Sequence, residues 1–437
     1  MKRLLTLDNP LLNLTARYIF DWSYHPTLRA GISSVLMASA LGMRVFAPSR
    51  AFKTLLTAHR LVKSGFWADL ELHIIRAWLP WWHSTGTRLL EHQPVTEEGL
   101  RLLRCRSLVL KPANESTGEK GVFLIKGHFA EAIASFDIGR LLETYRLVLE
   151  PGSAGYAFAP ILYFTGFPEH PVVVFAPYGG DRRFLEMLSS NLVAISLGAS
   201  DWVNPNVFRP LPGVSKIYDA VMVAYWGRVK RHHVLFRAIR ALRDKKFRVA
   251  LVGFPWDEGT RTQVEQLASW YGVSEQVTFF ERLPPEQVNL VLNQSKVNLL
   301  LSLKEGANRT LFEGMFADIP AILLQQNIGV NKEHIIDGVT GQLVSERDLP
   351  KALLWFREHY HEFRPRQWAL RHISPEASTA KLNSLLKEIA LERGEPWTRD
   401  IVAKTNCPDP MYYPDPSVAE GFPTVENLLQ HYGRART

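Results

Sequence analysis

The 437-residue sequence contains only two cysteines, Cys105 and Cys407, and they lie far apart. They provide neither a disulfide framework nor the CxxC spacing of a zinc site. Long apolar runs are missing too, because the least polar stretch, residues 30–43, is shorter than the roughly 20 residues that cross a bilayer. The first residues also lack the continuous apolar core of a signal peptide. These absences favour a cytoplasmic protein in which residues 30–43 form a buried helix.

Common ligand-binding signatures are absent as well. The sequence has neither GxGxxG nor GxxxxGK[ST], which argues against dinucleotide and P-loop sites. No DxD triplet follows a predicted strand, and the histidine pairs near residues 232 and 360 lack the i, i+4 spacing of helical metal sites. Nucleic-acid-binding motifs are missing, and the basic residues are spread along the chain. We therefore expect no metal, no other cofactor and no nucleic-acid partner.

Positive charge is in excess, with 51 Lys and Arg against 43 Asp and Glu, a net charge of +8. This balance suits an anionic partner such as a nucleotide diphosphate or an acidic lipid headgroup. Residues 1–110 are expected to be mostly helical, since their apolar residues recur at helical spacing. From Phe52 to Trp82 the apolar residues alternate with Lys and Arg and end in two tryptophans. This pattern fits either a helix at a membrane interface or helices packed on the protein's own core.

Two regions alternate short apolar, β-branched runs with helical patterns, which predicts parallel sheets covered on both faces. We therefore expect an α/β fold with two Rossmann-like, doubly wound domains behind a helical N-terminal region. The predicted strands are 121–126, 146–149, 171–175 and 192–197 in the first domain, and 220–225, 247–252, 277–280, 297–301, 321–324 and 342–344 in the second.

A stretch rich in proline, residues 203–216, separates the two alternating regions and predicts a linker. The expected organisation is a helical region at 1–110, a first α/β domain at 111–213 and a second at 214–390. Residues 391–437 are rich in proline and aromatic residues, which indicates an extended tail wrapped over a surface.

The segment most informative about chemistry is residues 302–320, SLKEGANRTLFEGMFADIP, directly after a predicted strand. Gly306 permits close approach of a ligand to the backbone, and Asn308 is a candidate helix cap. The free amides of the first helical turn, together with Arg309, suit phosphate oxygens.

Two glutamates, Glu305 and Glu313, lie eight positions apart in this segment, the first in the loop and the second in the helix. A carboxylate close to a phosphate site at a helix start can accept both hydroxyls of a ribose. Without further context, two such glutamates would instead be solvated surface groups.

That context is a resemblance. The E-x7-E spacing within EGANRTLFEGMFADIPAI resembles the donor-site signature of family 4 glycosyltransferases of the GT-B fold. Four other segments resemble the same family in the same order: WGRVKR with the helix that follows it, VALVG at 249–253, QVTFFE at 276–281 and HIIDGVTGQLV at 334–344. The second α/β domain is thereby expected to bind a nucleotide sugar, and the first becomes the acceptor-side domain.

The resemblance also implies roles for single residues. Arg228 and Lys230 would hold the donor diphosphate, Glu313 would bind the ribose and Glu305 would lie beside the transferred sugar. The loop around Lys230 is shorter than is usual in the family, so Arg231 is an alternative phosphate ligand, with Lys230 favoured. Three more residues are donor-side candidates: Gly253, which matches the family's glycine at the end of a strand, and Asn308 and Arg309, which replace residues that are usually small or aromatic in the family.

On the acceptor side the resemblance holds in outline only. The histidine that members of the family usually carry near the acceptor is missing from residues 173–180, VVFAPYGG. His128 and Glu150, each at the end of a predicted strand, are the candidate catalytic groups that remain. A purely structural role is the alternative for His128.

The resemblance implies a metal-independent, retaining transfer of sugar from a nucleotide-diphosphate sugar to a glycan or a lipid-linked acceptor. A cytoplasmic enzyme of polysaccharide biosynthesis, with peripheral association at the inner face of the membrane, fits this activity. Two rivals stay open: a GT-B-like phosphorylase or epimerase, and a catalytically inactive relative that binds a glycan or a membrane.

Overall fold

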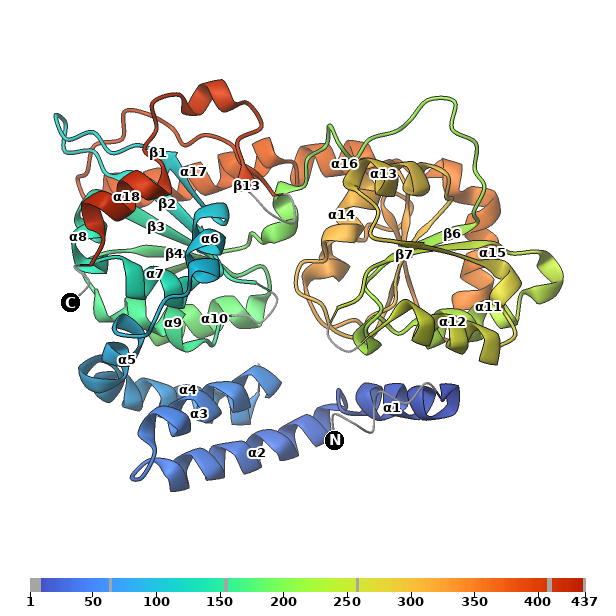
Figure 1. Cartoon of the computed structure of the whole chain (residues 1–437), viewed down its shortest axis with the longest axis horizontal. Coiled ribbons are helices and arrows are strands. Elements are labelled where there is room, and N and C mark those ends of the chain that lie inside the picture. The colour runs from blue at the N-terminus through green and yellow to red at the C-terminus, as the bar shows by residue number, and fades with distance from the viewer. Residues whose placement is uncertain (1–8, 63–64, 153–155, 257–258, 407–410, 435–437) are drawn as a thin grey trace. The chain divides into compact units, whose positions relative to one another are not determined.

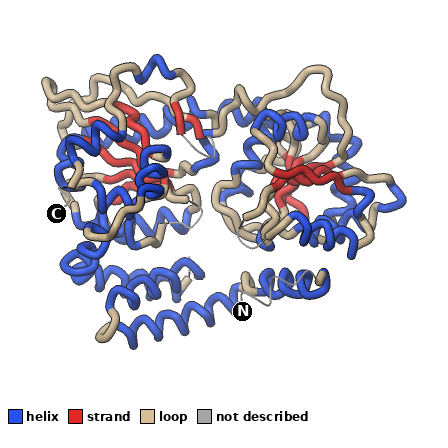
Figure 2. The backbone as a smooth tube through the Cα atoms, in the orientation of Figure 1, coloured by secondary structure: helices blue, strands red, loops and turns tan. Residues whose placement is uncertain are grey.

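The computed structural model describes residues 9–62, 65–152, 156–256, 259–406 and 411–434, which leaves Cys407 outside the described residues. The chain forms two compact units: unit 1 comprises residues 1–25 and 203–374, and unit 2 comprises residues 26–202 and 375–437. Each unit is built around a mainly parallel sheet with helices on both faces (Figures 1 and 2). The predicted fold class, α/β with two Rossmann-like units and a helical N-terminal region, is confirmed.

Unit 1 contains a six-stranded sheet in the order β11-β10-β9-β6-β7-β8, with every pair parallel. The chain runs outward from β6 through β7 and β8, then returns to the other side of β6 to form β9. The strand order therefore reverses between β6 and β9. The six strands, all predicted from the sequence, are β6 (Ala220–Val223), β7 (Val249–Gly253), β8 (Val277–Glu281), β9 (Asn298–Leu300), β10 (Ala321–Leu324) and β11 (Gly341–Val344).

Helices cover both faces of this sheet. Met222 and Leu251 pack toward one face, and their neighbours Val221 and Ala250 pack toward the other. Because both faces are buried, these strands are continuous apolar runs and not alternating ones. One face is covered by α11 (His232–Arg240), α12 (Arg261–Trp270) and α15 (Leu349–His359), and the other by α13 (Pro285–Asn293), α14 (Arg309–Phe316) and α16 (Pro365–His372).

The first helix, α1 (Pro10–Trp22), belongs to unit 1, where it lies against α12 and the turn at Arg228–Lys230. It begins where the side chain of Asn9 accepts hydrogen bonds from the amides of Leu11 and Leu12. This placement differs from the expected grouping of residues 1–110 as one helical region. The units also differ from the expected boundaries at Ser374, because the helix that follows belongs to unit 2.

Unit 2 contains a five-stranded sheet in sequential order, with β1 antiparallel to β2 and the other pairs parallel. The antiparallel edge strand β1 was not predicted. The chain between β2 and β3 forms two helices, the second of which begins where Asp137 accepts a hydrogen bond from the amide of Arg140. The strands are β1 (Ser107–Lys111), β2 (Gly121–Lys126), β3 (Tyr145–Glu150), β4 (Val172–Phe175) and β5 (Leu192–Ile195). The helices around this sheet are α5 (Thr87–Glu91), α6 (Glu97–Cys105), α7 (Phe129–Ser135), α8 (Ile138–Thr144), α9 (Ala159–Leu162) and α10 (Gly179–Leu188).

A layer of three helices precedes this sheet: α2 (Pro26–Met43), α3 (Pro48–Val62) and α4 (Phe66–Trp81). Its inner residues belong to the core of unit 2, which confirms the core interpretation of the region 52–82. The prediction that residues 30–43 form a buried helix is wrong. They form most of α2, which buries only Ser33, Met37 and Ala40. Among the described residues, no helix is long and apolar enough to cross a membrane. The buried residues of the layer include Phe52, Leu55, Leu56, Ile75, Trp78 and Trp82.

The C-terminal segment completes unit 2. Leu382 and Leu386 of α17 (Pro375–Glu392) pack on the face of the sheet formed by Val122 and Leu124. The tail then adds a two-stranded sheet and a last helix, as the wrapped tail predicted from the sequence requires. These elements are β12 (Thr405–Asn406), β13 (Met411–Tyr412) and α18 (Val425–Tyr432).

A buried ion pair anchors this tail to the sheet. The Lys404 ammonium donates to Glu150 Oε2 at 2.7 Å, and the Asn406 amide donates to Glu150 Oε1 at 3.1 Å. Both Lys404 and Glu150 are completely buried. Burial lowers the pKa of Lys404 to about 8, although Glu150 opposes the shift. Burial alone would raise the pKa of Glu150, but Lys404 and Lys126 more than offset it, so that pKa is lowered.

Replacing Lys404 with Met should destabilise unit 2 by about 3–5 kcal/mol, because it leaves a buried carboxylate without its main partner. The double variant Lys404→Met/Glu150→Gln should recover part of this loss, and Lys387→Met, at an exposed position of α17, should have little effect. Urea unfolding followed by circular dichroism measures all three. A Lys404→Met protein as stable as wild type would contradict the anchoring role.

Candidate functional site

Polar side chains gather at the carboxyl ends of β6 and β9, where the strand order of unit 1 reverses. In doubly wound sheets, ligands bind in the crevice at this reversal point. The chain after β6 forms a short turn at Arg228–Lys230, and the chain after β9 forms the loop 302–308 that leads into α14. The Lys230 ammonium and the Glu305 carboxylate form an ion pair between these two segments. The sheet thus brings together two residues that the sequence analysis selected separately.

This ion pair is largely removed from water, with the two side chains only 10% and 14% exposed. The Lys230 ammonium also lies 4.9 Å from the ring centre of Tyr225. Its neighbour Arg228 lies with its guanidinium carbon 5.9 Å from the ring centre of Phe20 in α1. Two predicted phosphate ligands therefore occupy one short turn at the reversal point.

The loop 302–308 is held in place by the segment that follows β10. Asn327 donates to the Ser302 carbonyl at 2.7 Å, and Asn331 donates to the Gly306 carbonyl at 2.8 Å. Both asparagines are completely buried. Gly329 has a φ of +141°, and a Cβ there would lie 2.1 Å from the Glu305 carbonyl oxygen. The loop therefore depends on a glycine and on the side-chain amides of two buried asparagines. The sequence analysis selected neither Gly329 nor Asn327.

The start of α14 supports the predicted helix cap. Asn308 Oδ1 accepts from the Leu311 amide at 3.1 Å and from the Thr310 hydroxyl at 2.8 Å. The next residue, Arg309, forms an ion pair with Glu313, one turn further along the helix, and its Nε lies 2.6 Å from Glu313 Oε1. The Glu313 side chain is only 8% exposed. The interpretation of Glu313 as a solvated surface group is therefore wrong.

Gly253, at the end of β7, has a packing explanation. A Cβ at this position would lie 2.5 Å from the Ala224 carbonyl oxygen and 2.7 Å from the Trp226 ring. The Trp226 indole itself donates to Glu281 Oε2 at 2.6 Å. Close contact within unit 1 is sufficient to require glycine here, and the donor-binding role of Gly253 stays a prediction.

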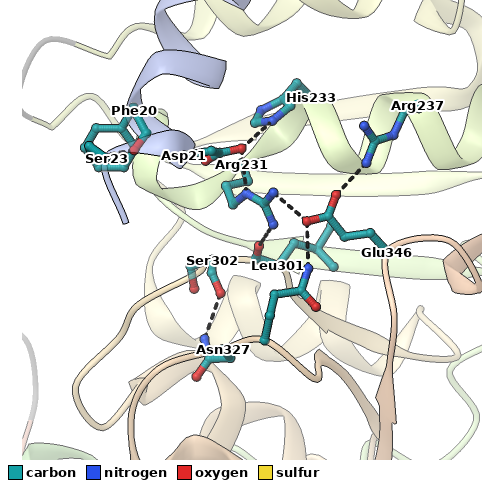
Figure 3. Close-up of polar contacts among 11 residues, drawn as sticks. Phe20, Asp21, Ser23, Arg231, His233, Arg237, Leu301, Ser302, Asn327 and Glu346 are labelled. Atoms are coloured by element: carbon teal, nitrogen blue, oxygen red, sulfur yellow. Dashed lines mark hydrogen bonds and ion pairs between the residues drawn. The ribbon is translucent and has the colours of Figure 1, made fainter. Parts of the chain in front are cut away.

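Arg231, the alternative phosphate ligand, is engaged in a network of its own (Figure 3). Its Nε donates to Asp21 Oδ2 at 3.0 Å, and its terminal nitrogens donate to Glu346 at 2.5 Å and to the Leu301 carbonyl at 3.4 Å. Asp21 lies 3.0 Å from His233 Nε2 as well. The network links α1 to the carboxyl ends of β9 and β11, and it explains how Arg231 is held in a left-handed conformation with φ 57°.

The arginines of this network favour the ionised form of the Glu346 carboxylate. Burial would raise the pKa of Glu346, but Arg231 and Arg237 outweigh it and lower that pKa. Burial lowers the pKa of His233, which Asp21 partly opposes. The Arg231 guanidinium thus meets two carboxylates and a carbonyl, whereas the Lys230 ammonium forms an ion pair with Glu305. The sequence contains no local signal for the Asp21 contact, because its partners lie more than 200 positions along the chain.

The acceptor-side candidates lie in unit 2. His128 follows β2 in a left-handed conformation with φ 42°, with its Nε2 3.1 Å from an Arg106 nitrogen and its Nδ1 3.5 Å from Glu131. Glu150 ends β3 but is completely buried against Lys404. This complete burial removes the basis for the catalytic role expected of Glu150. Among the residues that the structure describes, no group of three or more His, Cys, Asp or Glu could hold a metal ion.

Replacing Asp21 with Asn should loosen α1, because it removes the charge that faces Arg231 and His233. Hydrogen bonds to charged groups are worth about 1.5–3 kcal/mol, and the opening free energy of the α1 amides should fall by a similar amount in hydrogen exchange. Asp219→Asn is the matched control, since Asp219 is equally buried in unit 1 and pairs with Lys296 at 3.1 Å. Unchanged exchange of the α1 amides in the Asp21→Asn protein would contradict the role of Asp21.

Comparison with known proteins gives a match over the segment that carries this site. Residues 208–356 match the family model of the group 1 glycosyl transferases. The matched segment contains all six strands of the unit 1 sheet and the residues Lys230, Glu305 and Glu313. No curated protein matches the sequence.

Solved structures of glycosyltransferases are similar to the chain at low identity. A sucrose-phosphate synthase from Thermosynechococcus elongatus aligns with 16% identity and a TM-score of 0.48, over 62% of this chain and 74% of its own. HepE from Anabaena, in complex with UDP and glucose, aligns with 15% identity and a TM-score of 0.46, over 62% of this chain and 77% of its own. A glycosyltransferase from Rickettsia africae aligns with 16% identity and a TM-score of 0.47, over 61% and 76%. The comparison that bears on the site is therefore the family match, in which the segment carrying Lys230, Glu305 and Glu313 is similar to group 1 glycosyltransferases.

Proposed function

We propose that the protein is a retaining glycosyltransferase of the family 4 type, which moves a sugar from a nucleotide-diphosphate sugar to a glycan or a lipid-linked acceptor. The observation that carries the proposal is the Lys230–Glu305 ion pair at the reversal point of the unit 1 sheet. It lies in the segment that matches the group 1 glycosyl transferases. A cation and a carboxylate held together at this place suit a ligand that has a diphosphate and a sugar.

The diphosphate is assigned to Lys230, with Arg228 in the same turn and the first amides of α14 opposite. A phosphate that binds Lys230 replaces the Glu305 carboxylate as its anionic partner. Charge-assisted contacts of this kind are short and strong, and a helix N-terminus adds a favourable partial charge. During transfer, the same groups offset the charge that develops on the departing diphosphate, with no metal taking part.

The ribose is assigned to Glu313. Its Oε1 faces Arg309, and its side chain is held in a buried setting at the start of α14. A carboxylate fixed in this way can accept from two vicinal hydroxyls, which an amide cannot do with its single oxygen. Asn308, whose acceptor oxygen caps the helix, and Gly253 complete the proposed donor side.

The transferred sugar is assigned to the side of Glu305, which donor binding releases from Lys230. In a retaining transfer with attack on the face of departure, the leaving phosphate can accept the proton of the acceptor hydroxyl. The proposal therefore does not require a protein base, and His128 is kept as an acceptor-side candidate only. Cytoplasmic location, a role in polysaccharide biosynthesis and peripheral association with the inner face of the membrane belong to the same proposal.

Replacing Lys230 with Ala should weaken binding of a nucleoside diphosphate by roughly 1.5–3 kcal/mol, or about tenfold to a hundredfold, and leave binding of the nucleoside nearly unchanged. Calorimetric titration of both ligands measures the difference. Lys296→Ala is the matched control, because Lys296 pairs with Asp219 at the amino ends of β6 and β9, whose carboxyl ends carry the site. Equal losses for nucleoside and diphosphate would remove Lys230 from the phosphate site.

Replacing Glu313 with Gln should weaken binding of the nucleotide-sugar donor by roughly 1.5–3 kcal/mol while keeping the fold, because the change is isosteric. The preference for a ribose over a 2′-deoxyribose donor should shrink in the same variant, since the 2′-hydroxyl has lost its acceptor. Glu265→Gln in α12 is the matched control, because Glu265 forms a similar i, i+4 pair with Arg261 at 2.6 Å. A Glu313→Gln protein with unchanged affinity and unchanged ribose preference would overturn the assignment.

A further inference from the structure

The outer surface of α2 is largely apolar, although the helix also buries the apolar residues Met37 and Ala40. Ser33 is completely buried and donates to the Ala58 carbonyl at 2.9 Å and to the carboxylate of Glu71, which is also completely buried. The outward residues from Gly31 to Gly42 include no charged side chain. Helices on the surface of a water-soluble domain place polar groups outward and apolar groups inward. The polarity of α2 therefore suits an outer environment that is not water.

The turns beside α2 are more exposed still. The four most exposed large apolar side chains of the described residues are Phe46 (89%), Val45 (80%), Phe66 (74%) and Val35 (69%). Val35 lies in α2, Val45 and Phe46 lie in the turn between α2 and α3, and Phe66 is the first residue of α4. We call the outward residues 31–42 together with Val45 and Phe46 the α2 face. In Figure 1, α2 forms the outermost layer of unit 2, beyond α3 and α4.

The charge of this region indicates what covers the α2 face. Between Asp21 and Asp69 the sequence has no acidic residue and six basic ones: Arg29, Arg44, Arg50, Lys53, Arg60 and Lys63. Arg44, Arg50 and Lys53 are exposed, so a second copy of the chain packed here would bring like charges together, which is unfavourable. An anionic bilayer offers both an apolar interior and negative headgroups, and each basic residue near such a surface strengthens binding.

We propose that the α2 face is a membrane contact surface, on which α2 lies parallel to an anionic bilayer and inserts Val35, Val45 and Phe46. An 18-residue helix is roughly 27 Å long, which suits a helix lying in the interface. This surface is distinct from the buried residues of the region 52–82. The proposal deepens the peripheral association included in the proposed function, and it does not depend on sugar transfer.

The test is flotation of full-length protein with vesicles of phosphatidylcholine containing about one third phosphatidylglycerol, at low salt. Wild type should float, and the partition coefficient of Val45→Ser/Phe46→Ser should fall roughly tenfold or more, since two apolar side chains no longer insert. Leu391→Ser/Val418→Ser is the matched control, because both residues are exposed on unit 2 outside the α2 face, and it should float like wild type.

Wild type that stays unbound at low salt would overturn the proposal, as would an equal loss in the control. Light scattering gives a further outcome: a wild-type dimer that Val45→Ser/Phe46→Ser dissociates would make the α2 face a protein contact instead. Stabilisation by a nucleotide sugar, measured on the same variants, shows that unit 1 is folded. Vesicle binding and stabilisation by a nucleotide sugar are measured separately. The protein can therefore fail to bind vesicles and still be the proposed transferase, or bind vesicles and not be a transferase.

Discussion

The ion pair between Lys230 and Glu305 is the interaction on which this account of the protein depends. Both side chains are mostly out of water, so the pair is stable only because the fold satisfies and positions its two members. The unit 1 sheet does this by reversing its strand order between β6 and β9, which places the ends of both strands at one crevice. In the proposed function, a phosphate of the donor takes the place of the Glu305 carboxylate beside Lys230.

The surroundings of the pair come from distant parts of the chain. Asn327 and Asn331 hold the loop that carries Glu305, and Asp21 and Glu346 hold Arg231, the residue directly after Lys230. None of these four residues is assigned to the ligand. They fix backbone and side chains within reach of it, which is how a site on loops reaches the precision that recognition needs. In unit 2 the same type of long-range contact, between Lys404 and Glu150, serves the fold and not a ligand.

Much of the architecture could be predicted from the sequence, because parallel strands buried on both faces leave uninterrupted apolar runs such as residues 121–126 and 321–324. The site segment could be predicted too, since Glu305, Asn308 and Glu313 lie within nine positions of one another. The contacts of Asp21 and Glu150 could not, because each pairs with a residue more than 200 positions away. Helix α2 was predicted as buried because its composition is apolar, and apolar composition does not distinguish a protein core from a surface that meets another apolar phase.

The central claim is that unit 1 binds a nucleotide-diphosphate sugar, and thermal unfolding of the wild-type protein with UDP-, GDP- and ADP-sugars tests it most directly. A ligand at a hundred times its dissociation constant stabilises the folded state by roughly 2.7 kcal/mol. The account predicts that the sugars of at least one nucleotide raise the unfolding midpoint, and that the corresponding free nucleoside does so far less. A midpoint that no nucleotide sugar raises, at concentrations up to the millimolar range, would contradict it.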